Sequence, residues 1–157
     1  MASMRNHEEL IAWQLAAELR DRVLPILRRP KVAKDFDFCD QLRRSARSGP
    51  ANLAEGFGRH RPRDNARFVR IALATLHETQ NHLGDGRNSG YIGEREFTEL
   101  LQLSKRAVRT AVGWHNYLYN CRDTPLETHD DDSNNPRNQR TENPENPENS
   151  ENRRTEN

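Results

Sequence analysis

A dense group of arginines in the middle of this sequence has the chemistry to bind phosphate. Eight arginines fall between positions 43 and 70, where only Glu55 and Asp64 carry negative charge, so the local balance is +6. Arginine presents a planar fork of N–H donors that bonds two oxygens of a phosphate or carboxylate at once. We therefore predict an anion-binding surface. Its candidate residues are Arg43, Arg44, Arg47, Arg59, Arg61, Arg63, Arg67 and Arg70.

Two interpretations of this arginine-rich stretch stay open. In the first, its side chains bind the phosphate backbone of RNA or DNA. In the second, they form a solvated helix face that makes salt bridges with acidic residues of a neighbouring subunit. Only Phe57 and Phe68 are interleaved with the arginines, and Phe68 is expected in the core. Because base recognition uses stacking on aromatic rings, we expect backbone binding without sequence preference and with a steep dependence on salt.

The remaining reactive side chains do not form a recognisable catalytic or metal-binding set. His77 and His82 are five residues apart, so on a helix their directions differ by about 140°, whereas a zinc-protease helix places its histidines four apart. Glu55 has no second carboxylate or histidine at helical spacing and is expected to pair with an arginine. Cys39 and Cys121 are too few for a disulfide framework or a four-ligand zinc site. We expect no enzymatic activity, no metal and no cofactor.

Apolar side chains recur at helical intervals, with no strand-like alternation between them, and indicate an all-α fold. Four helices with short connections favour an antiparallel up-and-down four-helix bundle. By composition Gly84–Gly90 is a loop, and Arg29-Pro30 ends the first helix. The expected helices run from 8 to 27, from Asp35 or Asp37 to Gly56, and from Asp64 to 83, and the fourth follows Gly93 and reaches to about 119.

The pair Gly49-Pro50 stands in the middle of the second expected helix. Proline removes one backbone hydrogen bond and clashes with the carbonyl four residues earlier. Either one long helix kinks at Pro50, or a new helix begins there. The mostly small residues 51–54 would let helices or subunits pack closely in both cases. Gly56 is expected to close the helix in a left-handed conformation.

The first and fourth helices carry more apolar surface than one bundle face requires. Their apolar residues cover about half of the helix circumference or more, whereas a helix buried on one side needs a stripe of about 100°. Contiguous apolar patches of that size rarely persist on soluble monomers. We therefore expect the protein to self-associate. The alternative is that the wide faces are used entirely inside one bundle.

The chain divides by composition into a helical body, 1–123, and an acidic tail, 124–157. The net charge of +1 conceals this division, because the body has 21 basic and 15 acidic residues while the tail has 4 and 9. The tail is rich in Asn, Glu and Pro and contains almost no apolar residues, so we expect it to be disordered. No segment has the length and apolar character of a membrane span or a signal peptide, and a cytoplasmic location is expected.

The stretch SARSGPANLAEGFGR, residues 45–59, closely resembles the signature of the bacterial four helix bundle protein family, also called 23S rRNA-intervening-sequence or S23-like proteins. The resemblance covers residues 8–118 and includes ELIAWQLAAEL near the start and GYIGEREFTELL at the fourth helix. The motif positions, for which we expect a packing role, are Pro50, Ala51, Asn52, Ala54, Glu55 and Gly56.

This resemblance implies a four-helix bundle that assembles as a ring, typically a homopentamer. It also implies similarity in fold to the accessory variability proteins of diversity-generating retroelements, which bind nucleic acid and a reverse transcriptase. Our leading hypothesis is a non-enzymatic oligomeric bundle that binds nucleic acid, preferably RNA, through the arginines. The alternative is a protein-interaction scaffold, such as an accessory subunit of a retroelement reverse transcriptase.

Overall fold

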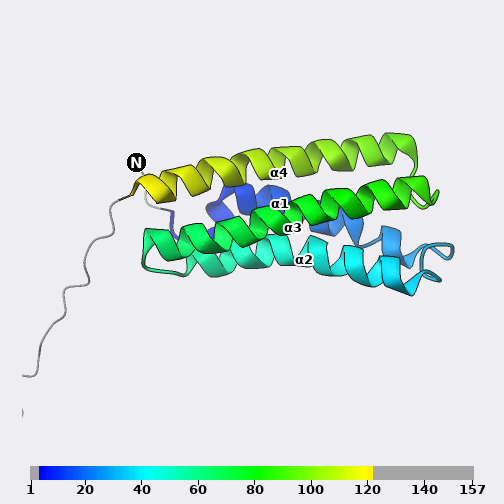
Figure 1. Cartoon of the computed structure of the whole chain (residues 1–157), viewed down its shortest axis with the longest axis horizontal. Helices are drawn as coiled ribbons and strands as arrows, with labels where there is room; N and C mark the ends of the chain where they lie inside the picture. The colour runs from blue at the N-terminus through cyan, green and yellow to red at the C-terminus, as the bar shows by residue number, and fades with distance from the viewer. Residues whose placement is uncertain (1–3, 122–157) are drawn as a thin grey trace, which may run out of the picture. The chain divides into compact units, whose positions relative to one another are not determined.

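The computed structural model describes residues 4–121, which form four helices packed side by side (Figure 1). Each helix contacts its neighbours along the chain, and α1 also packs on α4. The α1–α2 and α3–α4 faces are therefore on opposite sides of the bundle. The predicted all-α, antiparallel up-and-down bundle is confirmed, and the predicted tail, 124–157, lies outside the described residues. The helices are α1 (Ile11–Val23), α2 (Phe36–Phe57), α3 (Pro62–Asn88) and α4 (Glu94–Asn120).

Helix α1 is shorter than predicted. Short 3-10 turns at His7–Glu9 and Ile26–Arg28 flank it, so the single helix expected over 8–27 was wrong. Pro25 is the physical reason at its C-terminal end, because proline has no N–H to continue the helical hydrogen bonds. The chain still buries Ile26 beyond that break, so the apolar pattern continues although the α-helix does not.

Helix α2 is one continuous helix with Pro50 inside it, so the arrangement in which a new helix begins at Pro50 does not occur. Asp35 caps its start, since the Asp35 side chain accepts a hydrogen bond of 3.1 Å from the Phe38 backbone N–H. The predicted left-handed end at Gly56 was wrong. Gly56 is buried within the helix, which ends at Phe57 with Gly58 in a right-handed conformation, φ −72°.

Helix α3 begins earlier and ends later than predicted. Pro62 occupies its first turn, where the missing N–H costs nothing, so Asp64 is not its N-cap. The segment expected as a loop, Gly84–Gly90, is helical to Asn88. Gly86 is there for packing: a Cβ at this position would lie 2.8 Å from the side chains of Ile92 and Phe38. Composition alone could not distinguish this close approach from a turn.

The core contains the predicted seam of α2, with Leu42, Ala46 and Leu53 buried. Ile71, predicted on the inward face of α3, is instead 40% exposed. Most of the apolar width of α1 is buried inside the single chain, because α1 packs against α2, α4 and the turn that precedes it. The alternative interpretation, in which the wide apolar faces are buried inside one bundle, therefore accounts for most of the apolar surface of α1. Large apolar side chains remain exposed at Ile11, Phe36, Ile71, Val112, Tyr117 and Tyr119.

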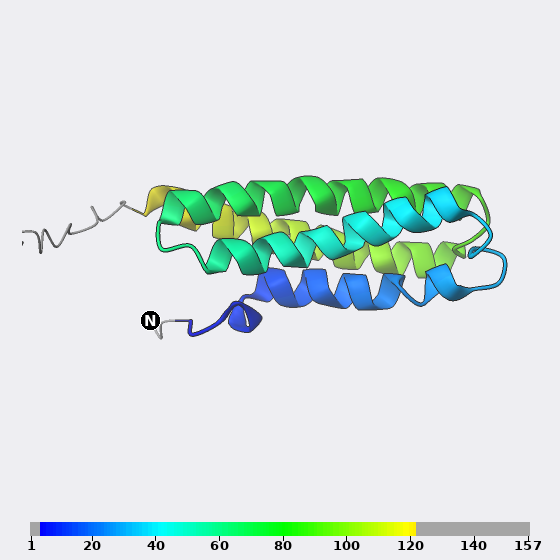
Figure 2. The ribbon, with the colours of Figure 1, turned by 90° about the horizontal axis from the view of Figure 1, so that it is seen from below.

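The chain ends of the described part lie at the same end of the bundle as the α2–α3 connection (Figure 2). The α1–α2 and α3–α4 connections lie at the other end. None of the four helices between residues 4 and 121 is long and apolar enough to cross a membrane.

Candidate nucleic-acid interface

The structure divides the eight predicted arginines between separate faces of the bundle. Arg47 lines a groove between α1 and α2, and Arg43, one helical turn earlier, lies on the same side of α2. Arg63, Arg67 and Arg70 line a second groove, between α3 and α4. Because these two faces lie on opposite sides of the bundle, the arginines do not form the single surface that their closeness in sequence suggested.

The α3–α4 groove has the stronger basic character. Arg63, Arg67 and Arg70 are spaced four and three residues apart, so they form one stripe along α3. The groove has a volume of about 290 Å³, and Ala66 of α3 with His115 and Tyr119 of α4 complete its lining. We call these six residues the basic groove.

Two aromatic residues of the basic groove escaped the sequence analysis. His115 and Tyr119 are one helical turn apart, and their rings lie nearly parallel, with centroids 6.1 Å apart and an interplanar angle of 18°. Tyr119 is 70% exposed. More than forty residues separate these rings from the arginines in the sequence, so only the antiparallel packing of α3 on α4 brings them together. The cluster of aromatic residues near the end of α4 was the signal in the sequence that could have pointed to them.

Several basic side chains of α3 and α4 lie in stretches that contain no acidic residue. Residues 65–77 of α3 and 100–121 of α4 contain no Asp or Glu. Arg67 and Arg70 make no ion pair with any residue between 4 and 121, and neither do three further cations of α4. These three are Lys105, Arg106 and Arg109.

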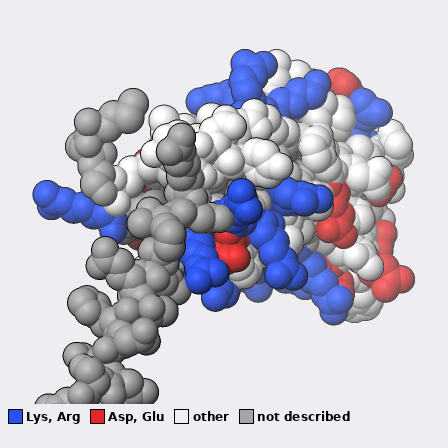
Figure 3. All heavy atoms as spheres, turned by 60° about the vertical axis from the view of Figure 1, so that its left-hand side comes forward, with Lys and Arg blue, Asp and Glu red and all other residues white. Residues whose placement is uncertain are grey.

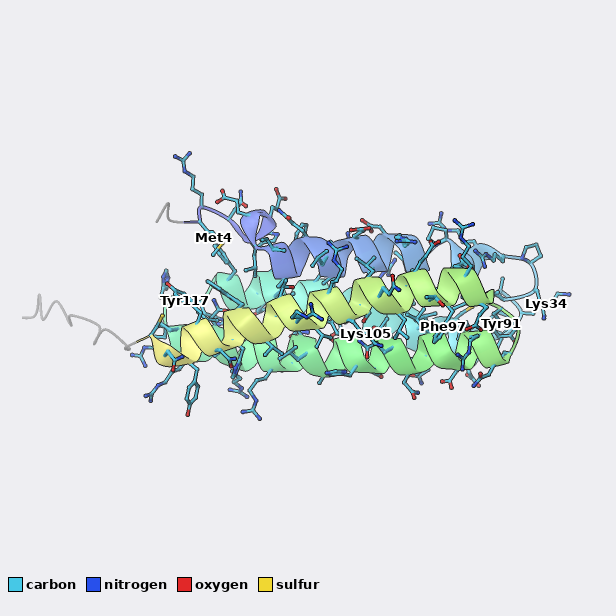
Figure 4. The ribbon with its side chains drawn as sticks, turned by 90° about the horizontal axis from the view of Figure 1, so that it is seen from above. Met4, Lys34, Tyr91, Phe97, Lys105 and Tyr117 are labelled. Atoms are coloured by element: carbon cyan, nitrogen blue, oxygen red, sulfur yellow. The ribbon has the colours of Figure 1, made fainter. Side chains whose placement is uncertain are left out.

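Ion pairs gather instead toward the other end of the bundle. Arg29 bonds Glu96 at 2.6 Å, and Arg22 bonds Glu99 at 3.0 Å, which ties the first part of the chain to the start of α4. In Figure 3 the end that carries the α2–α3 connection shows many more basic than acidic side chains. Figure 4 locates Lys105 at mid-length on α4 and Tyr117 near its end, far from Lys34. The positive charge is therefore concentrated toward one end.

The two arginines of the α2–α3 connection have different surroundings. Arg59 pairs with Glu55 one helical turn earlier, and its guanidinium lies 4.8 Å from the centroid of the Phe68 ring. The predicted pairing of Glu55 with an arginine is thus observed. Arg61 is exposed and immediately precedes α3. Arg44, on the exposed side of α2, pairs with Asp40 at 3.0 Å.

The family-motif positions of α2 pack the bundle. A Cβ at Gly56 would lie 2.8 Å from Phe68 Cβ and from Asn65 Oδ1, so glycine lets α2 and α3 meet. The Asn52 side chain donates a hydrogen bond of 2.8 Å to the Ser48 carbonyl. Pro50 is buried with one edge toward the α1–α2 groove, where Ala51 and Ala54 add a surface of small residues.

The α1–α2 groove is larger, about 520 Å³, and less basic. Trp13 and Leu24 contribute its apolar lining. Arg20 and Asp21 form an ion pair of 2.8 Å at its edge, which lowers the pKa of the Asp21 carboxyl and raises that of Arg20. Neither groove brings together an acid, a base and a nucleophile. Residues 4–121 also contain no group of three or more His, Cys, Asp or Glu side chains placed to hold a metal ion.

The comparisons with known proteins agree with this fold. The family model described as 23S rRNA-intervening sequence protein matches residues 8–113. A crystal structure of a protein of unknown function from the S23 ribosomal protein family, from Bacteroides thetaiotaomicron, superposes with a TM-score of 0.61 and 21% sequence identity. The match covers 66% of this chain and 96% of that one, and at this identity it concerns the fold alone. No curated protein matches the sequence.

Proposed function

This chain belongs to the family of 23S rRNA-intervening sequence proteins, and from that premise we propose that it binds RNA through the basic groove without catalysing a reaction. The observation that carries the proposal is that Arg67 and Arg70 line the groove without an ion pair to any residue between 4 and 121, in stretches 65–77 and 100–121 that contain no carboxylate. Cations without acidic partners attract phosphate, and their counterions are released when phosphate binds.

The rings of the groove extend the proposal to unpaired nucleotides. Bases stack on exposed aromatic side chains, and each such contact contributes about 1–3 kcal/mol to binding of a single strand. Tyr119 offers such a ring beside Arg63 and Arg67. A strand that follows the arginine stripe with its phosphates would bring a base over Tyr119. We therefore expect single-stranded or looped RNA to bind more tightly than a regular duplex.

Neutral substitutions of two groove arginines test this function. We expect Arg67→Gln with Arg70→Gln to weaken binding of a single-stranded RNA about tenfold or more in about 50 mM salt, because two phosphate contacts are lost. The slope of log K against log salt should become less steep by about 1.4, which is about 0.7 for each contact. Filter binding or fluorescence anisotropy measures both quantities.

The matched control removes the same charge elsewhere. Arg44 and Arg95 are exposed and each pairs with an acid on its own helix, so Arg44→Gln with Arg95→Gln changes the net charge equally without touching the groove. This control should change RNA affinity less than about threefold, the order of one weak surface charge interaction. Equal loss in both double variants would contradict a localised site. Absence of salt-sensitive RNA binding by the unaltered protein would overturn the function itself.

We propose in addition that copies of the chain assemble through the α1–α2 face. The groove on this face combines Trp13 with the small residues Ala51 and Ala54, which permit close approach of another helix. Assembly would repeat the basic groove and raise the affinity for long RNA by avidity. The solution mass from light scattering, measured with and without RNA, tests this step.

A protein-interaction scaffold is the second candidate, with the same α1–α2 face presented to a protein such as a reverse transcriptase. The apolar lining of that groove is the observation that favours it. A stable complex with a protein partner, formed by a chain that shows no salt-sensitive RNA binding, would decide for the scaffold.

A further inference from the structure

A line of side chains on α4 leads from the basic groove toward the middle of the bundle. Tyr119, Val112 and Lys105 follow one another at intervals of seven residues, and seven residues complete two helical turns to within about 20°. All three side chains are exposed, and Lys105 lies at mid-length on α4 (Figure 4). We propose that an RNA strand bound in the basic groove continues along this line and places a phosphate on Lys105. This path rests on the proposed function and gives the RNA site a direction and a length.

Helix α3 runs beside this line of side chains. The Gln80 side chain donates a hydrogen bond of 3.0 Å to the Ser104 hydroxyl of α4, which fixes the register of the two antiparallel helices near mid-length. Lys105 follows Ser104 directly, and the exposed His77 lies one helical turn from Gln80 in the direction of the basic groove. The register therefore places Lys105 beside the seam between α3 and α4, further from the bundle end than Arg70.

The path along this seam is free of carboxylates. Residues 65–77 of α3 and 100–121 of α4 contain no Asp or Glu. Lys105 makes no ion pair with any residue between 4 and 121, so its charge is available to phosphate. The carboxylates that follow these stretches are Glu78, which lies against a histidine of its own helix, and Glu99, which is paired with arginines of α1 and α4.

The other exit of the basic groove suits an RNA strand less well. It leads to the α2–α3 connection, where Arg59 and Arg61 are accompanied by Glu55 and Asp64, so that these four charges cancel. Arg59 is moreover paired with Glu55. A phosphate at this exit would meet carboxylates, whereas a phosphate on the seam would meet an unpaired cation at Lys105.

The distance along the helices sets the length of the site. Lys105 and Tyr119 are fourteen residues apart, which corresponds to about 21 Å along α4. Stacked nucleotides of one strand rise about 3.4 Å each, so about six nucleotides cover this distance. The arginine stripe from Arg63 to Arg70 covers about 10 Å, or about three nucleotides. The affinity for RNA should therefore increase with strand length up to about six nucleotides.

The test compares two strand lengths on the full chain. We expect Lys105→Gln to weaken binding of an oligouridylate of eight nucleotides about threefold or more in about 50 mM salt, and to change binding of one of three nucleotides less than about twofold. For the longer strand, the slope of log K against log salt should become less steep by about 0.7, the value for one phosphate contact. Fluorescence anisotropy measures both quantities. Unchanged binding of the longer strand, or equal loss for both lengths, overturns the inference.

The matched control is Arg106→Gln, which removes the same charge one position further along α4. Arg106 also makes no ion pair with any residue between 4 and 121, but it lies about 200° around the helix from Ser104, nearly opposite the contact with α3. This variant should change the affinity for the longer strand less than about twofold, and a loss equal to that of Lys105→Gln contradicts a path along the seam.

The same measurements separate this inference from the proposed function. If the unaltered chain shows no salt-sensitive binding of either strand, the proposed function fails and the path fails with it. If both strands bind with the same affinity and Lys105→Gln changes neither, the path fails alone and the basic groove remains the RNA site.

Discussion

At the scale of single residues, the two cysteine thiols of this protein lie in different surroundings. Cys39 is buried at 5% exposure, and its thiol donates a hydrogen bond of 3.3 Å to the Val32 carbonyl. Burial raises the pKa of this thiol, because the thiolate is poorly solvated there. Cys121 is half-buried at the end of α4.

We expect the two thiols to differ in reactivity. At about pH 8 a disulfide reagent should modify one thiol per native chain, at Cys121, and should reach Cys39 only when the protein unfolds, because the thiolate is the reactive form. Counting released chromophore with and without denaturant measures this. A Cys121→Ser variant that still reacts rapidly in the native state would contradict the prediction.

Replacing Gly56 with a larger residue is expected to destabilise the contact between α2 and α3. Gly56→Ala would drive a Cβ toward Phe68 Cβ and the Asn65 backbone carbonyl, at 2.8 and 3.2 Å. We expect the free energy of unfolding to fall by about 1–2 kcal/mol, since overpacking outweighs the gain in helix propensity. Denaturant unfolding measures the change.

Gly113 is the matched control for that experiment. It lies in α4, and no side chain or neighbouring helix comes within 4 Å of the place that a Cβ would occupy. Gly113→Ala should therefore raise the free energy of unfolding by up to about 1 kcal/mol, the difference in helix propensity. A gain in stability at both sites would show that propensity, and not the contact of α2 with α3, decides the outcome at Gly56.

At the scale of elements, helix α1 has one side buried in the core and another side exposed to solvent. Leu19 is 1% exposed and lies within the core, while Ile11, at the start of the same helix, is largely exposed. A helix with apolar residues on most of its circumference can satisfy that pattern inside one chain, because α2 and α4 cover two sides of it. Little of the apolar surface of α1 is therefore left exposed to solvent.

Substitutions in α1 distinguish its inner from its outer face. Leu19→Ala should lower the free energy of unfolding by about 3 kcal/mol, through lost burial and the cavity left behind. Ile11→Ala should change it by less than about 0.5 kcal/mol, because an exposed side chain loses little on truncation. Thermal or denaturant unfolding at a fixed protein concentration provides the comparison, and equal losses would show that Ile11 is also buried in the folded protein.

For the whole molecule, the arrangement of charge matters more than its sum. Ion pairs join the first part of the chain to α4 toward one end, while arginines line the basic groove toward the other. A chain with a net charge of only +1 can therefore still present a strongly positive surface. Because the α1–α2 and α3–α4 faces are opposed, self-association through one leaves the other accessible.

Assembly of whole molecules gives a prediction of its own. Ala51→Glu should lower the solution mass toward that of a single chain, because a charge in the α1–α2 groove, which is the proposed contact face, must be desolvated for copies to meet. Ile71→Glu, at an exposed site of α3, should leave the mass unchanged. Light scattering at micromolar concentration measures both, and a single-chain mass for the unaltered protein would exclude assembly under these conditions.

The sequence by itself determined the class of fold, the inner seam of α2, the Asp35 cap and the pairing of Glu55, because each depends on residues a few positions apart. Only the tertiary structure decided where the arginines lie relative to one another. Arginines that are close in the sequence lie on opposite faces of the bundle, and the antiparallel packing of α3 on α4 places Arg67 and Tyr119 in the lining of one groove. It also decided that Gly56 and Gly86 are helical, since local composition records flexibility, whereas close packing between helices depends on which residues face each other across the bundle.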